Sequence, residues 1–288
     1  MDLISYENLI RNENSARKYL LGFCWKNHQR FCPRCRHRKL YPLSSGRRRC
    51  ARCKYTFHDF SRRFLNIGNL SPQDWLRVIK LFELEVPQST IAQQTCLAPN
   101  TVAKALNTIR LAIAAQALDA HQLYEAGLGR DVLKSHAPAD AAHDDSCWPP
   151  IFGLVEQGGL AFLDILPDLN VESLIHFKRN FRLRTAALGS VVYTDRFSPY
   201  LSLLVSGPQE IWRDWQGNPV AHKDKGLAVD TTQQFWRFAK ERLRRYRGIA
   251  PERFPLYLKE LEFRYNHRNA DIFEEISRLL CTFVPDLG

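Results

Sequence analysis

Two cysteine pairs, a closely spaced pair of helices and a later change to strand-like alternation predict a multidomain protein. The expected order is a small zinc ribbon, a helix-turn-helix and a larger α/β domain. The cysteine pairs lie before residue 54, the helix pair lies between residues 89 and 118, and the alternation begins at Ile151. The expected domains are therefore residues 1–66, 67–120 and 121–288.

The cysteine pairs have the spacing of metal ligands. Cys32 and Cys35 are separated by two residues, and Cys50 and Cys53 repeat this spacing fourteen residues later. Two such turns supply the four thiolates of a structural Zn²⁺ site, which leaves no open position for a substrate. Disulfide pairing is the alternative, but no secretory signal is visible at the N-terminus. The other cysteines are scattered, which fits a reducing cytoplasm: Cys24, Cys96, Cys147 and Cys281.

Positive charge gathers around these cysteines. Residues 26–63 hold thirteen Lys and Arg and one acid, Asp59, whereas the whole chain carries a net charge of +11. Such a cluster predicts a polyanionic partner, DNA or RNA, although a solvated basic face is the alternative. The candidate contacts are Arg34, Arg36, Arg47, Arg48, Arg49 and Arg52. Four aromatic residues interleave with the bases, and we expect them in the ribbon core rather than on nucleotides: Tyr41, Tyr55, Phe57 and Phe60.

Helical patterns flank the ribbon. Residues 5–24 predict a helix before it, and Ser71 with Pro72 marks the start of another after it. A short helix over 89–94 and a longer one over 101–118 then follow the plan of a helix-turn-helix. Three packed helices that bind no DNA are the alternative. The exposed start of the last helix would face DNA with Asn100, Thr101, Lys104 and Asn107.

Strand and helix patterns alternate in the last part of the chain. Residues 119–149 predict a linker, and the segments 151–155 and 160–166 predict a β-hairpin. A helix over 171–181, a strand over 191–194, a loop-rich region and helices over 231–247 and 252–266 follow. Asp195 ends that strand, where an acid suits metal binding, although a turn-forming role is the alternative. No apolar run reaches eighteen residues, so we expect no membrane span.

Four segments together resemble a known family: residues 151–156, 192–195, 235–243 and 257–268. They resemble the motifs of insertion-sequence DDE transposases with an N-terminal zinc ribbon, the ISXO-like transposases, over roughly residues 25–268. The resemblance implies an RNase H-like domain in which acidic side chains hold Mg²⁺ or Mn²⁺ for cleavage and transfer of DNA strands. It also implies a dimer or larger assembly on transposon ends.

The resemblance assigns roles to particular residues. Asp195 corresponds to the second acid, and Lys240 to a base that contacts phosphate near the metals. Gln233 stands where the family has its third acid, and Asp230, three residues earlier, is a candidate replacement or a helix-start acid. Asp131 is the preferred first acid, and the alternatives are Asp140, Asp144 and Asp145.

The departures at the first and third acids leave other hypotheses open. One is a degenerate or domesticated transposase that binds DNA without cutting it. Another is a transcription regulator in which the ribbon and the helix-turn-helix are joined to an unrelated sensor domain.

Overall fold

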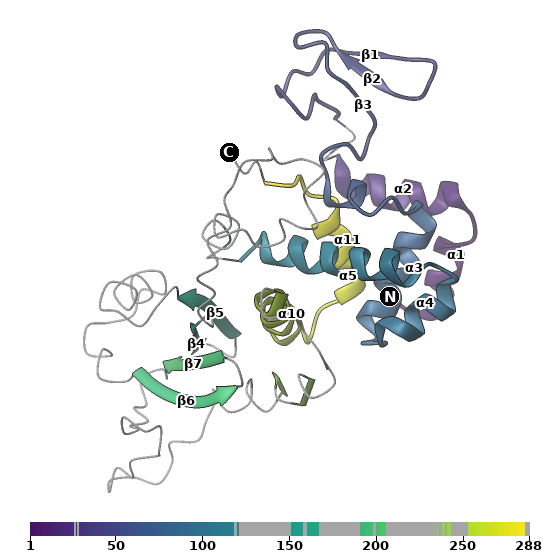
Figure 1. Ribbon diagram of the computed structural model, residues 1–288. Coiled ribbons are helices and arrows are strands. Elements are labelled where there is room, and N and C mark those ends of the chain that lie inside the picture. Colours follow the sequence, from purple (N-terminus) through teal and green to yellow (C-terminus); the bar gives the residue numbers. More distant parts are fainter. Residues whose placement is uncertain are drawn as a thin grey trace, which may run out of the picture. The chain divides into compact units, whose positions relative to one another are not determined.

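The computed structural model describes the backbone of residues 1–25, 27, 29–117, 120, 151–157, 160–166, 191–197, 200–205, 235, 238–239, 241–242 and 253–285. These residues fall into two compact units (Figure 1). Residues 1–115 together with 270–285 form the first unit, and the described residues between 116 and 269 belong to the second. The sequence analysis placed everything after residue 120 in one domain, whereas the structure groups the segment after residue 270 with the first unit.

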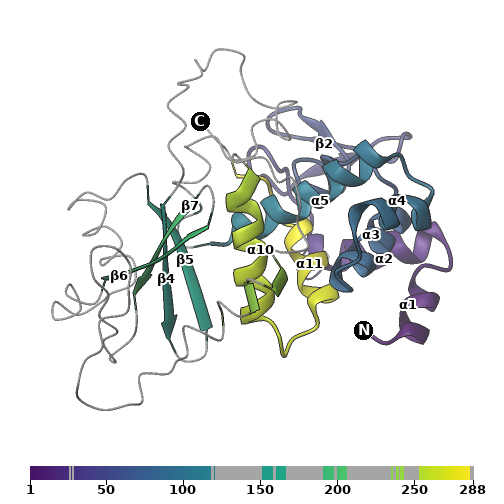
Figure 2. The ribbon, with the colours of Figure 1, turned by 60° about the horizontal axis from the view of Figure 1, so that its bottom comes forward.

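The first unit contains the helices α1 (Leu3–Leu9), α2 (Glu13–Cys24), α3 (Pro72–Glu83), α4 (Gln88–Thr95), α5 (Pro99–Ala114) and α11 (Ile272–Leu280). Helix α5 lies centrally and is buried at every position from Ala105 to Ala114. Helix α11 packs against α2, α3 and α5 (Figures 1 and 2). No helix among the described residues is long and apolar enough to cross a bilayer.

The helix expected over 5–24 is two helices, so that prediction was wrong in detail. Asn12 has an extended backbone (φ −152°, ψ 162°), and its side chain accepts a hydrogen bond from the Ser15 backbone N–H at 2.8 Å. This is the geometry of an N-cap, and Glu13 adds a favourable acid in the first turn of α2. The cap starts a new helix where hydrophobic periodicity alone suggested continuity.

Helix α3 begins as predicted and is anchored by a buried tryptophan. The Ser71 hydroxyl caps the helix by accepting a hydrogen bond from the Asp74 N–H at 3.1 Å. The Trp75 side chain is 1% exposed, and its indole N–H donates to the Leu65 carbonyl at 3.0 Å. This contact fixes α3 against the 3₁₀ turn Phe64–Asn66 that follows the ribbon.

Gly68→Ala is expected to lower the free energy of unfolding by about 1–3 kcal/mol. A Cβ at this position would lie 2.6 Å from Cζ2 of Trp75, a buried ring that cannot move aside freely. Gly22→Ala is the matched control, because a Cβ there meets nothing within 4 Å. Alanine within α2 should be neutral or stabilising. Thermal denaturation of both variants measures the difference, and equal melting temperatures would contradict the steric argument.

Helix α11 completes the core of the first unit. Phe273 is fully buried and meets the ring of Tyr6 edge-on at 5.8 Å and the ring of Tyr19 at 6.0 Å. Asp271 caps the helix by accepting a hydrogen bond from the Glu274 N–H at 3.0 Å. The sequence analysis had identified no helix here.

The segment after α11 pairs with the chain that leaves the ribbon. The Val284 N–H donates to the Arg62 carbonyl at 2.9 Å, and Arg63 and Phe283 form an antiparallel bridge. The Arg63 side chain is 3% exposed, and its guanidinium donates to the carbonyls of Cys24 (2.6 Å) and Cys281. The same guanidinium lies over the rings of Trp25 and Phe283, with its carbon 4.6 Å and 4.2 Å from the ring centroids. Arg63 therefore connects α2, the ribbon and the C-terminal segment.

The second unit contains a four-stranded mixed sheet in the order β5-β4-β7-β6 (Figure 1). Strands β4 (Ile151–Gln157) and β5 (Leu160–Leu166) form the predicted antiparallel hairpin, and β7 (Tyr200–Val205) lies parallel to β4. Strand β6 (Val191–Phe197) pairs with β7 in antiparallel fashion. The sequence analysis ended this strand at Asp195, whereas β6 continues to Phe197, and β7 occupies the first part of the region that was expected to be rich in loops. The rest of that region, residues 206–230, lies outside the described residues.

Helix α10 (Phe254–Asn266) packs against the edge strand β5 and agrees with the helix predicted over 252–266. The Asn266 side-chain amide forms two hydrogen bonds of 2.7 Å with the backbone of Ala161, one to its N–H and one to its carbonyl. A side-chain amide thereby takes the place of a neighbouring strand at this point of the edge. The predicted helix over 231–247 is described at only a few residues, where Phe235 is fully buried with its ring 5.2 Å from that of Tyr265.

Candidate metal centre and basic surface

The ribbon is a three-stranded antiparallel sheet of β1 (Leu40–Pro42), β2 (Arg48–Cys50) and β3 (Thr56–Phe57) with two cysteine turns. The turns have the same construction. The Arg36 N–H donates to the Cys32 carbonyl at 2.9 Å, and the Lys54 N–H donates to the Cys50 carbonyl at 3.1 Å. Arg36 and Lys54, each next after the second cysteine of its pair, have left-handed φ values of 60° and 61°.

The four thiols converge on one point. The Sγ atoms of Cys32, Cys35, Cys50 and Cys53 all lie within 4.8 Å of one another. Two contacts join the turns at 3.5 Å, Cys32 Sγ to Cys53 Sγ and Cys35 Sγ to Cys50 Sγ. Tetrahedral Zn²⁺ with bonds of about 2.3 Å places its sulfur ligands about 3.8 Å apart. The thiol cluster therefore fits a structural zinc ion, as the spacing predicted.

The surroundings of the thiols affect their protonation. Burial raises the pKa of the Cys32 thiol to about 12. Burial also opposes ionisation of Cys50, but the backbone N–H groups of Cys53 and Arg52 and the adjacent thiols outweigh it and lower the pKa of Cys50 to about 6. Zinc binds thiolates, so it must displace protons, and its affinity falls as the pH falls.

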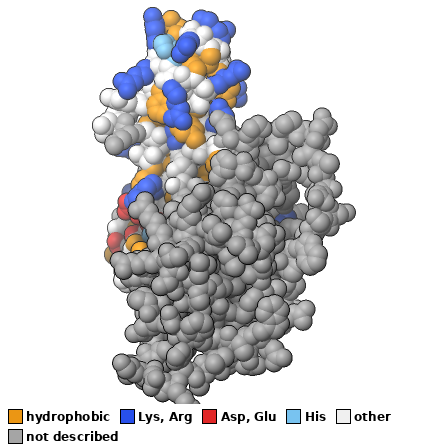
Figure 3. Space-filling model, turned by 90° about the vertical axis from the view of Figure 1, so that its left-hand side faces the viewer, with side chains coloured by type: hydrophobic (Ala, Val, Ile, Leu, Met, Phe, Trp, Pro, Cys, Tyr) orange, Lys and Arg blue, Asp and Glu red, His pale blue; other side chains and the backbone are white. Residues whose placement is uncertain are grey.

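Basic side chains cover the ribbon in the view of Figure 3. Five of the six predicted DNA contacts here are exposed, namely Arg34, Arg36, Arg47, Arg49 and Arg52. Arg48 is only partly exposed because it faces Asp59. Arg36 is exposed but also lies over two aromatic rings, with its guanidinium carbon 5.4 Å from the centroids of both Phe31 and Phe283.

Asp59 is the acid that connects the ribbon to α2. It is 8% exposed, and its carboxylate pairs with three arginines: Arg30 Nε at 2.9 Å, Arg17 Nη2 at 3.3 Å and Arg48 Nε at 3.7 Å. One negative charge thus offsets part of the basic cluster on a single side of the ribbon. Arg48 consequently has a structural partner that its position in the run of arginines did not reveal.

The ribbon aromatics divide into two groups. Phe57 and Phe60 are buried as expected, and Tyr55 is half-buried and stacks on Phe57 with 6.0 Å between the centroids. Tyr41 is 48% exposed, so the expectation that it belongs to the ribbon core was wrong.

The start of α5 is accessible, but the accessible part is shorter than expected. Asn100 is exposed, and Thr101 and Lys104 are partly exposed. Asn107, which the sequence analysis placed on the same accessible face, is 6% exposed and accepts a hydrogen bond from Arg110 Nη1 at 3.4 Å. Its burial follows from the central position of α5.

The candidate catalytic residues are mostly outside the described part of the chain. Asp131, Asp230, Gln233 and Lys240 all lie in segments that the structure does not describe. The backbone of Asp195 lies within β6, where the pairing with β7 shifts register between Tyr193 and Arg196. Such irregularities re-aim side chains and are frequent beside active sites.

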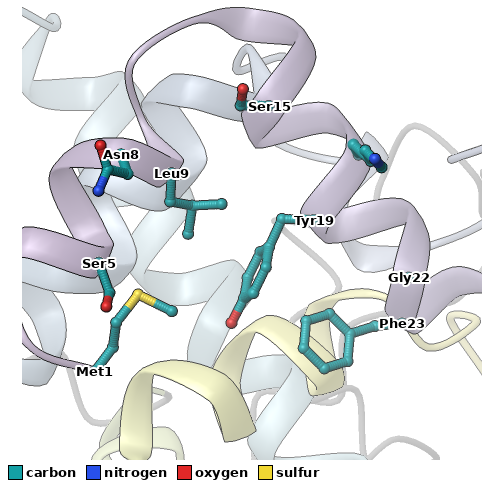
Figure 4. A pocket seen from close by; sticks show the side chains of 9 residues that line it. Met1, Ser5, Asn8, Leu9, Ser15, Tyr19, Gly22 and Phe23 are labelled. Carbon is teal, nitrogen blue, oxygen red and sulfur yellow. The ribbon is translucent and has the colours of Figure 1, made fainter.

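A groove of about 740 Å³ lies between α1 and α2 (Figure 4). Leu9, Tyr19 and Phe23 line it with apolar side chains, and among the described residues of its lining only Lys18 has a charged side chain. Because the described residues of the lining include no carboxylate, histidine or cysteine, they offer neither an acid–base pair nor a set of metal ligands.

Comparison with known proteins identifies the two parts of the chain. Residues 11–56 match the family model of a transposase zinc-ribbon domain, and residues 139–266 match that of an ISXO2-like transposase domain. A relative from Haemophilus influenzae, named as an uncharacterized transposase-like protein, is 37% identical over 91 residues, which are 31% of this chain and 69% of the relative. The chain belongs to the IS1595 family of transposases.

Membership of the IS1595 family confirms the resemblance found in the sequence. The zinc-ribbon match includes all four clustered cysteines, so the thiol geometry and the family agree on a structural zinc site. The ISXO2-like match includes Asp195, Asp230, Gln233 and Lys240 but not Asp131. No solved structure matches the chain.

Proposed function

We propose that this IS1595-family transposase binds the ends of its insertion sequence and catalyses metal-dependent cleavage and transfer of DNA strands. The observation that carries the proposal is the match of residues 139–266 to the ISXO2-like transposase domain, in the same chain as a zinc ribbon. The domain is expected to have an RNase H-like fold, and the active assembly is expected to be a dimer or larger.

DNA binding is assigned to two surfaces of the first unit. The exposed ribbon arginines carry positive charge without intervening acids, which suits phosphate contacts. The helices α4 and α5 would act as a helix-turn-helix, with α5 entering the major groove through Asn100, Thr101 and Lys104. No acid lies between Glu85 and Asp119, so nothing in that stretch repels the DNA backbone.

Catalysis is assigned to acids of the second unit. Asp195 with Asp131 and Asp230 would hold Mg²⁺ or Mn²⁺, which when bound stabilises the attacking and leaving oxygens of an in-line displacement at phosphorus. Gln233 would contribute a neutral amide at the usual place of an acid, and Lys240 would hold a DNA phosphate. The position of Asp195 within β6 supports this role, because pairing with β7 on both sides of it holds the strand in the sheet.

Asp195→Asn is expected to reduce strand cleavage by about 100-fold or more, because a metal-binding carboxylate is worth several kcal/mol in such a site. DNA affinity and zinc content should remain unchanged. The assay uses purified protein, Mg²⁺ or Mn²⁺, and DNA from the flanks of the gene. Glu7→Gln, which removes an exposed acid from α1, is the charge-matched control.

The outcome separates the two hypotheses about this transposase. Metal-dependent cleavage that only Asp195→Asn abolishes supports an active enzyme. Tight DNA binding without cleavage by the unmodified protein would contradict the proposal and favour a degenerate transposase that acts as a DNA-binding protein.

A further inference from the structure

The two faces of the ribbon sheet differ in composition. In the sheet register Tyr41 pairs with Arg49, and Arg49 pairs with Thr56. These three side chains share one face, and all three are exposed. The next pair in the same register is Arg48 with Phe57, and their side chains lie on the opposite face. Phe57 is buried there, and Arg48 forms an ion pair with Asp59.

Backbone pairing extends the exposed face beyond the strands. The Leu43 N–H donates to the Arg47 carbonyl at 2.9 Å, and the Ala51 N–H donates to the Lys39 carbonyl at 3.0 Å. Alternation along the strands places Lys39, Leu43 and Arg47 on the same side as Tyr41, and all three are exposed. We call this surface the outer face of the ribbon: Lys39, Tyr41, Leu43, Arg47, Arg49 and Thr56.

No described residue compensates the charge of the cations on the outer face. Among the described residues, Lys39, Arg47 and Arg49 form no ion pair or hydrogen bond through their side chains. The only acid between residues 26 and 63 is Asp59, which pairs with Arg48 of the opposite face. The charge on the outer face is therefore available to an external polyanion.

Apolar side chains lie among these cations, as they do on the ribbon in Figure 3. Tyr41 is 48% exposed and Leu43 is 39% exposed. A flat aromatic ring between uncompensated cations suits nucleotides, which present phosphates on the outside and apolar sugar and base surfaces between them.

We propose that the outer face is the DNA-contacting surface of the ribbon. Lys39, Arg47 and Arg49 neutralise phosphates, and the Tyr41 ring packs on a sugar or base of the same duplex. This inference rests on the proposed function and narrows the surface that contacts DNA. It assigns the contact to the outer face and not to the ribbon arginines that have partners within the protein. It also assigns a role in DNA binding to Tyr41, a residue to which the proposed function gives no role.

The test measures affinity of the zinc-loaded full chain for a random-sequence DNA duplex over a range of salt concentrations. Arg49→Ala should lower the slope of log Kd against log salt by about one, since one phosphate contact is lost. Tyr41→Ala should weaken binding about fivefold or more with an unchanged slope, because apolar packing of the ring on a sugar or base edge is not electrostatic. Tyr41→Phe keeps the ring and should restore most of the affinity.

Arg11→Ala is the matched control, because Arg11 is an exposed cation of the same unit outside the ribbon. Its loss should change neither the DNA affinity nor the slope of log Kd against log salt. Zinc content of each variant verifies that the ribbon is folded. If the unmodified protein binds DNA with steep salt dependence but Arg49→Ala and Tyr41→Ala behave like Arg11→Ala, the outer face is excluded while the proposed function stands. If the unmodified protein does not bind DNA, the proposed function itself fails.

Discussion

Cys32→Ser is expected to abolish zinc binding and unfold the ribbon. The ribbon has only short strands and a small apolar core around Phe57, so most of its stability must come from the metal. Structural zinc contributes about 10–16 kcal/mol of apparent binding free energy in small zinc domains, far more than such a core can supply. Metal analysis should show one zinc per chain in the unmodified protein and none in the variant. Proteolysis should then cut the ribbon rapidly.

Cys96→Ser is the control for the loss of a thiol. Cys96 is exposed at the end of α4 and is not part of the thiol cluster, so its replacement should leave zinc content and protease resistance unchanged. An unmodified protein that folds its ribbon without metal would contradict the zinc assignment. Retention of zinc by Cys32→Ser would instead show that three thiolates suffice.

Phe273→Ala is expected to lower the free energy of unfolding of the first unit by about 3–5 kcal/mol. Its ring is fully buried against Tyr6 and Tyr19, so truncation removes apolar contacts and leaves a cavity between α11 and α2. Urea denaturation followed by circular dichroism measures the loss. The effect should extend to α1 and α2, although they lie at the other end of the sequence.

Arg278→Ala is the matched control on the same helix. Its side chain is 51% exposed and pairs with Glu274 and Glu275, an arrangement worth at most about 1 kcal/mol. A similar effect of the two substitutions would mean that α11 contributes through surface charge rather than through packing. A negligible effect of Phe273→Ala would mean that the first unit is stable without α11.

Local signals in the sequence predicted several elements correctly. The cysteine spacing, the Ser71 cap and the hairpin at 151–166 all depend on residues close together in the chain, so the sequence contains the whole signal. Helix α11 was missed although Asp271 and Glu274 form a recognisable start signal. One of its buried partners, Tyr6, is more than 260 residues away, and no local pattern reveals it.

The roles of single side chains were harder to predict than the elements. Arg48 resembles its neighbours in sequence, but Asp59 gives it an internal partner. Asn107 has the spacing of an accessible helix residue, but the central position of α5 buries it. Tyr41 resembles a core aromatic, but the sheet register turns it outward. Each outcome depends on neighbours brought together by folding.

The position of α11 in the chain also affects the order in which the protein can fold during synthesis. The first unit begins with residues 1–115, yet α11 emerges from the ribosome only after the whole second unit has been made. Until then, the surfaces of α2, α3 and α5 that α11 covers have no partner, and Arg63 lacks the Cys281 carbonyl that it binds. The contact between Arg63 and Cys281 joins residues 218 positions apart, and contacts of such long sequence separation form slowly. A nascent or prematurely terminated chain therefore cannot present a complete first unit, so the first unit becomes fully stable only in chains that also carry the second unit.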